Sequence, residues 1–303
     1  MVTGKKGIRR QLAGTASAIV RSARPAQWVK NLVVFAAPVA SGTVLRGGGF
    51  VPLAMTVLAF CAAAGGTYLV NDLADLNADR LHPRKRHRPI AAGEVSAGAA
   101  GVAAAGFLVT GVMFGLVVGP VVAAVVVGYE VVTFAYSRWL KHVAVVDVAA
   151  LALGFVLRVA AGAAATGAGL RASLVGAVFF GTMFVALTKR RGERGELGDD
   201  AVEHRRVLAV YSDRFLTALS TGSLGGAMLS YGVWVVVRPA GEGGLWLDLS
   251  LLPLLVGVWR FATLAWQGQA ADPQRMFGRE RALQLAALAT VILAATGAHA
   301  ALT

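Results

Sequence analysis

Long apolar runs recur along the whole chain and are separated by short polar, glycine-rich or proline-containing segments. The hydrocarbon core of a bilayer needs about 20 apolar residues per helix, and none of the runs alternates at the spacing of membrane-barrel strands. The pattern predicts an all-α, polytopic membrane protein with nine transmembrane helices. They are expected near residues 28–45, 50–70, 97–118, 120–136, 144–165, 171–188, 214–236, 246–266 and 282–302.

The composition agrees with a membrane location. Hydrophobic residues make up 56% of the 303 positions and charged residues 15%, whereas a soluble domain carries about 25% charged residues. This excludes a disordered chain and an ordinary cytosolic enzyme. Cys61 is the only cysteine, so the chain is not a disulfide scaffold.

Positive charge is concentrated on one side of the predicted helices. The chain has 29 Lys and Arg against 16 Asp and Glu, and most of the basic residues precede the first helix or follow the second, fourth, sixth and eighth. Because cytoplasmic loops carry excess Lys and Arg, we expect a multi-pass protein of the plasma (inner) membrane with its N-terminus inside. Residues 1–24 are expected to form a basic cytoplasmic tail or interfacial helix, and residues 25–303 the nine-helix domain. We expect it to contact the lipid bilayer and no nucleic acid.

The end of the second predicted helix carries candidate metal ligands. At about 100° per residue, Asn71, Asp72, Asp75 and Asp79 share one helix face, and Pro83 ends the helix soon after. Three carboxylates on one face repel one another unless a cation lies between them. Mg²⁺ accepts one or two carboxylates and keeps water or phosphate oxygens as its other ligands. The spacing therefore predicts a Mg²⁺ site at Asn71, Asp72, Asp75 and Asp79.

A basic run follows directly and includes Lys85 and Arg88. Basic side chains beside a metal ion are favourable if an anion such as pyrophosphate lies between them. The alternative for the whole segment is a solvated, salt-bridged helix on the membrane surface. Lysine is otherwise rare, and Lys30, Lys141 and Lys189 each lie at the predicted cytoplasmic end of a different helix. We expect these lysines to contact substrate phosphates as compact point charges.

Three further charged residues are predicted inside the membrane, where a charge is costly and usually faces protein or water. Asp147 and Arg158 share a face of the fifth predicted helix, about 16 Å apart along its axis. Arg158 either closes the floor of a pocket or extends toward the outer interface, and the sequence leaves both open. Glu130 is expected to be a packing partner of Arg158 or of another buried donor rather than a catalytic group.

The aspartate spacing resembles the first aspartate-rich motif of the UbiA-type polyprenyl transferase superfamily. Members of that superfamily are nine-helix membrane proteins that bind a Mg²⁺–pyrophosphate near the cytoplasmic ends of their helices. The resemblance is stronger to one branch, whose members act on a phosphorylated ribose rather than on a prenyl diphosphate. It is carried by Arg24-Pro25-x-Gln27-Trp28-x-Lys30-Asn31, by Asn71-Asp72-x-x-Asp75-x-x-x-Asp79, by His82-Pro83-x-Lys85-x-x-Arg88-Pro89-Ile90-Ala91-Ala92-Gly93 and by Tyr136-Ser137-x-x-Leu140-Lys141.

This resemblance implies a UbiA-type bundle with a cytoplasmic active site and a Mg²⁺-dependent pentosyl transfer. The substrates would be 5-phosphoribose 1-diphosphate and decaprenyl phosphate, and the lipid product would supply arabinan cell-wall precursors. It also suggests a homotrimer. Asp147 fits the position of the superfamily's second aspartate motif, although one carboxylate stands where other members have two. The implied catalytic and metal residues are Asp72, Asp75 and Asp79, with Asn71; the implied substrate-binding residues are Lys30, Asn71, Lys85, Arg88, Tyr136, Lys141, Asp147, Arg158 and Lys189.

Two other functions are compatible with these features. An aromatic polyprenyl transferase of a quinone pathway would share the fold and the metal. A transporter for a phosphorylated anion would also need a basic membrane protein, but such transporters commonly have repeated halves and binding sites near the midplane. The chain shows no clear repeat, and its charge lies at one face.

Overall fold

The computed structural model describes residues 14–45, 49–83, 85–197, 211–237, 244–269 and 272–300, and every regular element in these ranges is a helix. The all-α prediction is therefore confirmed for this part of the chain. The long helices are α3 (Phe50–Ala74), α5 (Ala97–Val118), α6 (Pro120–Arg138), α7 (Val146–Thr166), α8 (Ala172–Leu197), α10 (Asp213–Val236), α11 (Gly244–Trp266) and α13 (Arg281–Ala300). The shorter elements are η1 (Pro25–Phe35), α2 (Ala36–Ala40), η2 (Thr43–Leu45), α4 (Leu76–Leu81), η3 (Lys85–His87), η4 (Leu140–His142) and α12 (Pro273–Arg279).

Seven of the long helices are both long and apolar enough to cross a membrane. The eighth, α10, has 24 residues and matches the predicted span at 214–236, but its Ser, Thr and Gly residues lower its hydropathy. The first predicted span, at 28–45, is not one α-helix. It consists of the 3₁₀ helix η1, the five-residue α2 and the short η2. Gly42 follows α2 at φ 69°, the left-handed conformation that commonly ends a helix.

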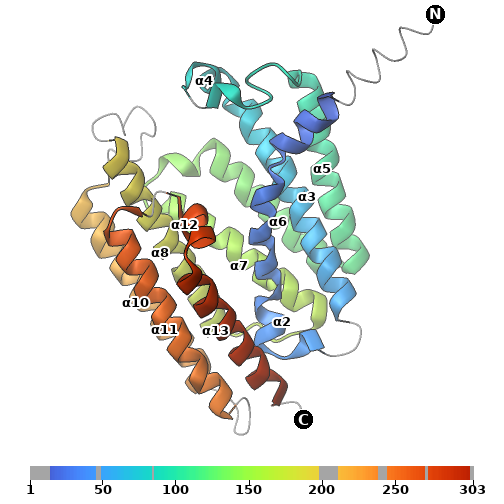
Figure 1. Cartoon of the computed structure of the whole chain (residues 1–303). Helices are drawn as coiled ribbons and strands as arrows, with labels where there is room; N and C mark the ends of the chain where they lie inside the picture. The colour runs from blue at the N-terminus through green and yellow to red at the C-terminus, as the bar shows by residue number, and fades with distance from the viewer. Residues whose placement is uncertain are drawn as a thin grey trace, which may run out of the picture.

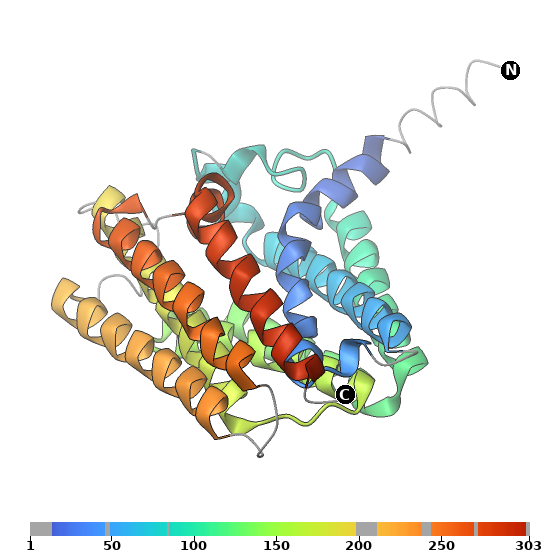
Figure 2. The ribbon, with the colours of Figure 1, turned by 60° about the horizontal axis from the view of Figure 1, so that its bottom comes forward.

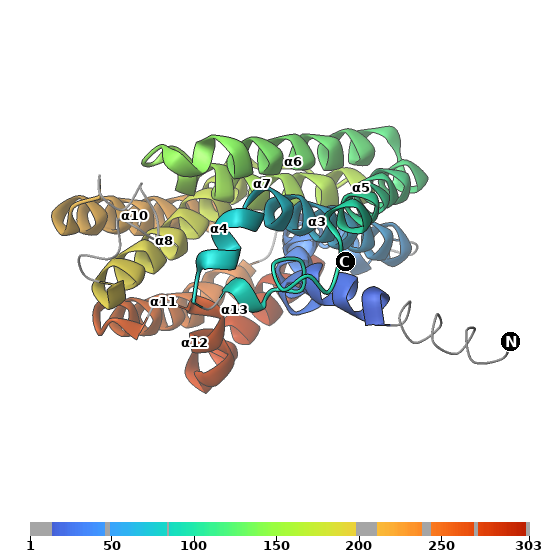
Figure 3. The same cartoon turned by 90° about the horizontal axis from the view of Figure 1, so that it is seen from above.

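The helices pack against one another in chain order around the bundle. Each of α3, α5, α6, α7, α8, α10 and α11 contacts the next long helix, and α13 closes the arrangement by packing on both α11 and α2. Figures 2 and 3 show this succession from two further directions, with the blue η1 segment lying between α3 and the dark-red α13. The η1 segment contacts both α3 and α7; it buries Asn31 and Val34, whereas Val29 and Leu32 on its other side are exposed.

The core is built where η1, α3, α6 and α7 meet. Val34, Phe60 and Val126 are fully buried there, and Tyr129 packs edge-on against Phe60. Gly162 of α7 is required by this packing, because a Cβ atom at that position would lie 1.8 Å from the carbonyl oxygen of Val34. The close approach fixes the backbone of η1 against α7.

Different segments of the chain lie at the two ends of the bundle. The α4 segment and α12 lie toward one end, whereas α2 and the C-terminal end of α13 lie toward the other (Figure 1). The first end therefore collects the loops that follow the second and eighth predicted helices, both of them rich in basic residues. Residues 14–22 precede η1 and are helical. Residues 1–13, the remainder of the expected basic tail, lie outside the described residues.

Candidate active site

The aspartate segment is two helices rather than one. The α3 helix ends at Ala74, Asp75 takes a non-helical conformation (φ −94°, ψ 5°), and α4 begins at Leu76. The prediction of one continuous helix is thus wrong at Asp75, where the regular helix is interrupted, although Asp72 and Asp79 both contact Arg88. Asp72 and Asp79, on either side of the interruption, are each only 2% exposed.

Arginines hold these two buried carboxylates. The Nη1 atom of Arg88 lies 3.1 Å from Asp72 Oδ1 and 2.6 Å from Asp79 Oδ2. Arg24 also donates to Asp72 Oδ1, and its guanidinium lies 4.8 Å from the ring centre of Tyr68. The Asp72–Arg24 contact joins residues 48 positions apart in the sequence, so it places the entry to η1 directly beside the aspartate segment.

Two lysines predicted to bind phosphate lie in the same cluster. Lys141 Nζ in η4 is 3.1 Å from Asp75 Oδ1, and Lys85 Nζ is 4.0 Å from Asp79 Oδ1. Each of the three aspartates therefore has at least one cationic partner. Asn71 is half-buried at the end of α3, and its carbonyl accepts the Asp75 backbone N–H.

The donor set at this place fits a magnesium ion bound by a pair of carboxylates. Within the described ranges, no three Asp, Glu, His or Cys side chains are arranged to hold a metal. However, one guanidinium nitrogen contacts both Asp72 and Asp79, so these two carboxylates face a common point. Mg²⁺ commonly takes one or two carboxylates together with substrate phosphate oxygens. Asp75 is directed to Lys141 instead.

Asp147 is fully enclosed at the start of α7. Its Oδ2 accepts from Arg190 Nε at 3.0 Å, and its Oδ1 accepts from the Tyr211 hydroxyl at 2.6 Å. Burial and the hydrogen bond to Asp147 raise the pKa of the Tyr211 hydroxyl above its ordinary value, so this group stays protonated and donates. Sequence reasoning missed Tyr211, because no local pattern marks a tyrosine 64 residues beyond its partner.

Arg158 lies in the core and does not extend to an interface, since only 7% of it is exposed. It donates to Asn31 Oδ1 at 2.8 Å, to the Gly154 carbonyl at 2.8 Å and to the Tyr129 hydroxyl at 3.0 Å. Its guanidinium also lies 4.5 Å from the Tyr129 ring centre. Asn31 adjoins Lys30 in η1, so Arg158 holds the element that carries this lysine.

Tyr136 and Lys189 complete the predicted set. Tyr136 lies on the last turn of α6 and is half-buried. Lys189 lies on α8 with 46% of its side chain exposed, and its Nζ is 3.7 Å from Glu193 Oε1. Lys30 is half-buried in η1.

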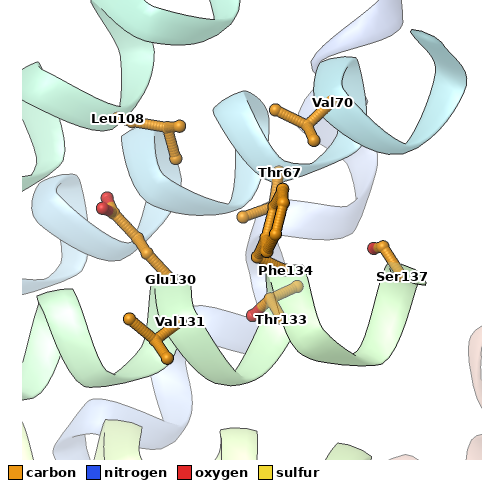
Figure 4. Close-up of a pocket in the computed structure, with 8 residues that line it drawn as sticks. All are labelled: Thr67, Val70, Leu108, Glu130, Val131, Thr133, Phe134 and Ser137. Carbon is orange, nitrogen blue, oxygen red and sulfur yellow. The ribbon is translucent and has the colours of Figure 1, made fainter. Parts of the chain in front are cut away.

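Glu130 is not a partner of Arg158. Its Oε1 atom is buried without a hydrogen-bond partner among the described residues. It borders a cavity of about 270 Å³ between α3, α5 and α6, shown in Figure 4. The lining is otherwise apolar or hydroxyl-bearing and consists of Thr67, Val70, Leu108, Val131, Thr133, Phe134 and Ser137. This cavity has none of the aspartates or lysines described above.

Known proteins resemble this chain over most of its length. A decaprenyl-phosphate phosphoribosyltransferase of Mycobacterium tuberculosis is 35% identical over 287 residues, which cover 92% of this chain and 93% of that protein. The Corynebacterium glutamicum protein of the same name is 33% identical over 282 residues, covering 91% and 85%. Among solved structures, a UbiA homologue from Archaeoglobus fulgidus bound to GPP and Mg²⁺ has a similar fold. Its TM-score is 0.71 at 19% identity, with 94% of this chain and 100% of that chain covered.

The family sequence model named UbiA prenyltransferase family matches residues 35–288. This range includes the aspartate segment, Lys141, Asp147 and α8. Because seven helices in the described part of the chain are long and apolar enough to cross a bilayer, this is an integral membrane protein. It belongs to the UbiA prenyltransferase family.

Proposed function

We propose that this protein transfers the 5-phosphoribosyl group of 5-phosphoribose 1-diphosphate to decaprenyl phosphate. The products are decaprenylphosphoryl-5-phosphoribose, a precursor lipid for cell-wall arabinan, and diphosphate. The names of the mycobacterial and corynebacterial relatives support this choice. The observation that carries it is the interleaving of Asp72, Asp75 and Asp79 with Arg24, Arg88, Lys85 and Lys141. Such a cluster suits a substrate that brings several phosphates and a metal ion.

The two facing carboxylates, Asp72 and Asp79, are proposed to hold Mg²⁺, with Asn71 and Asp75 beside them. Bound there, the ion would neutralise charge that develops on the departing diphosphate. Arg88 already contacts both carboxylates, so it has to share them with the ion or move to the diphosphate oxygens. Arginine suits a place at the diphosphate oxygens, because its planar guanidinium group can bind a phosphate group through two hydrogen bonds.

The remaining cations are proposed to bind the other anionic groups. Lys85, Lys141 and Lys189 would bind the sugar 5-phosphate and the diphosphate. Lys30 would bind the phosphate of the lipid, on an element that Arg158 fixes through Asn31. An attacking phosphate monoester is already an anion at neutral pH, so the reaction needs little help from a general base. Attack in line with the leaving diphosphate would invert the configuration at C1.

We also propose that the chain crosses the membrane nine times. Residues 28–45 and α10 would bring the seven apolar helices to nine spans, with residues 25–303 as one transferase domain. The basic loops would place the N-terminus and the active site in the cytoplasm, at the plasma membrane. Tyr136, one turn before η4, would contact substrate. A homotrimer remains the proposed assembly.

The deciding experiment gives the purified protein labelled 5-phosphoribose 1-diphosphate, decaprenyl phosphate and Mg²⁺, with no aromatic acid present. Formation of a labelled lipid that disappears with EDTA is the expected result. The absence of labelled lipid would reject the proposal. Prenylation of an aromatic acid from a polyprenyl diphosphate in a parallel reaction would then identify the rival activity, a quinone-pathway transferase.

A further inference from the structure

The hydroxyl group of Tyr211 makes two hydrogen bonds at the start of α7, one to the backbone and one to a side chain. It accepts the backbone N–H of Val145 at 2.6 Å and donates to Asp147 Oδ1 at 2.6 Å. The tyrosine side chain is fully buried, and its ring stacks on Phe215 with a centroid separation of 6.0 Å. Because the oxygen both accepts and donates, the position of this hydroxyl is fixed by two partners.

The backbone that Tyr211 holds is strained. Val145 has φ 68° and ψ −45°, a conformation that is costly for a β-branched residue. Strained residues of this kind persist only where the surrounding structure holds them in place. The Tyr211 hydroxyl is a side-chain partner of the Val145 N–H, so it is one of the groups that hold this turn.

The strained turn is connected to the aspartate segment. Only Val143 and Ala144 separate it from η4, which contains Lys141. Lys141 in turn lies 3.1 Å from Asp75. A change in the backbone at Val145 would therefore shift the η4 backbone, which carries Lys141, relative to the aspartates.

Asp147, the second partner of the Tyr211 hydroxyl, is linked to Lys189 through further side-chain contacts. Asp147 accepts from Arg190 Nε at 3.0 Å, and Arg190 Nη1 donates to Glu193 Oε2 at 3.2 Å. Glu193 Oε1 lies 3.7 Å from Lys189 Nζ. Arg190 has only 4% of its side chain exposed and Asp147 none, so this part of the chain of contacts is sealed from solvent. Both carboxylate oxygens of Asp147 are already occupied by protein donors.

We propose that Tyr211 is a positioning residue that sets the separation of Lys141 and Lys189 for a sugar with a 5-phosphate and a 1-diphosphate. It acts on Lys141 through the Val145 turn and on Lys189 through Asp147, Arg190 and Glu193. Asp147 then serves the same purpose and does not contact the substrate. This inference rests on the proposed function, because that function assigns both lysines to the phosphates of the sugar donor.

The test is the Tyr211→Phe variant, which removes one oxygen and keeps the ring in its stack with Phe215. We expect the KM for 5-phosphoribose 1-diphosphate to rise about tenfold, a loss typical of a displaced binding group, while kcat falls less than about threefold. The KM for decaprenyl phosphate should stay at the wild-type value. An unchanged KM for the sugar donor would overturn the proposal.

Tyr231→Phe is the matched control. The Tyr231 hydroxyl also makes a short side-chain contact, 2.8 Å from Ser250 Oγ, but it lies between α10 and α11, away from both lysines. Its loss should leave both KM values at the wild-type level. An equal rise in the sugar KM in both variants would show a general loss of packing and would also overturn the proposal.

Amide hydrogen exchange gives a readout that does not depend on the reaction. In Tyr211→Phe the peptide containing the Val145 amide should exchange faster than in wild type, and in Tyr231→Phe it should not. Unchanged exchange in Tyr211→Phe would refute the proposed hold on Val145. If wild type forms no labelled lipid, the proposed function fails, whereas the exchange result still decides the role of the hydroxyl.

Asp147→Asn provides a second variant should Tyr211→Phe fold poorly. Its remaining side-chain oxygen can still accept from Tyr211, but its amide would meet the Arg190 donor. We expect a raised KM for the sugar donor with the Val145 amide still protected. A wild-type KM in this variant would contradict the proposed path to Lys189.

Discussion

Arg88→Gln is expected to destabilise the protein without Mg²⁺ and to strengthen binding of a divalent ion. Arg88 contacts Asp72 and Asp79 through one nitrogen, and both carboxylates are almost fully buried. Two unit charges about 3 Å apart attract by about 5 kcal/mol at an effective dielectric constant near 20. Desolvation offsets much of this, and removing one partner of a buried pair costs about 3–5 kcal/mol.

The expected effect is smaller than that range for two structural reasons. The Arg88 side chain is 27% exposed, which weakens its interactions through solvent screening. Arg24 also remains on Asp72, and Lys85 stays 4.0 Å from Asp79. We therefore expect a loss of about 2 kcal/mol in the free energy of unfolding. If an ion and Arg88 compete for the same carboxylates, that energy corresponds to about 30-fold tighter ion binding.

Two measurements check this prediction in detergent without sugar diphosphate. Unfolding followed with and without Mg²⁺ should show a lower stability for Arg88→Gln and a larger gain on adding the ion. Mn²⁺ binding measured by electron paramagnetic resonance should be tighter than in wild type. Arg86→Gln is the control, because Arg86 is exposed and its Nε donates to His87. Wild-type stability together with wild-type Mn²⁺ affinity in Arg88→Gln would refute the reasoning.

Three further substitutions test other parts of the site and the fold. Asp75→Asn should abolish Mg²⁺-dependent turnover while circular dichroism stays at wild type, and near-normal turnover would remove Asp75 from the site. Lys141→Ala should raise the KM for the sugar diphosphate more than it lowers kcat, because Lys141 is assigned to substrate phosphate; steady-state kinetics with an unchanged KM would exclude that role. Gly162→Ala should lower the unfolding temperature, since its Cβ would lie 1.8 Å from the Val34 carbonyl oxygen; a melting curve identical to wild type would show that η1 moves away without cost.

The sequence predicted the helix bounds well where the length of an apolar run determined them. Helices α5, α6 and α7 begin and end close to the predicted spans, because a long apolar run that crosses a bilayer must satisfy its backbone hydrogen bonds within itself. The region at 28–45 is the exception. Its hydropathy resembles that of a span, but it folds as η1, α2 and η2, and its tertiary contacts with α3 and α7 could not be read from hydropathy.

The sequence named several residues of the cluster around Asp72, Asp75 and Asp79, but not Arg24, and it did not predict which residues pair. The acidic and basic residues of the segment from Asn71 to Arg88 could be recognised from their types and spacing. Which cation meets which carboxylate could not, because Arg24 and Asp72 are 48 residues apart and Lys141 and Asp75 are 66 apart. Only folding brings such pairs together, and no periodicity within either segment encodes them.

Apolar length and residue type are local properties, so the sequence alone predicted a helical membrane protein with most of its basic residues before the first span or between the spans. Long-range packing set the interruption of the helix at Asp75, the enclosure of Asp147 by Arg190 and Tyr211, and the burial of Arg158 against Asn31, 127 residues away. A buried charge is stable only beside its partners, and those partners come from whichever helices pack next to it.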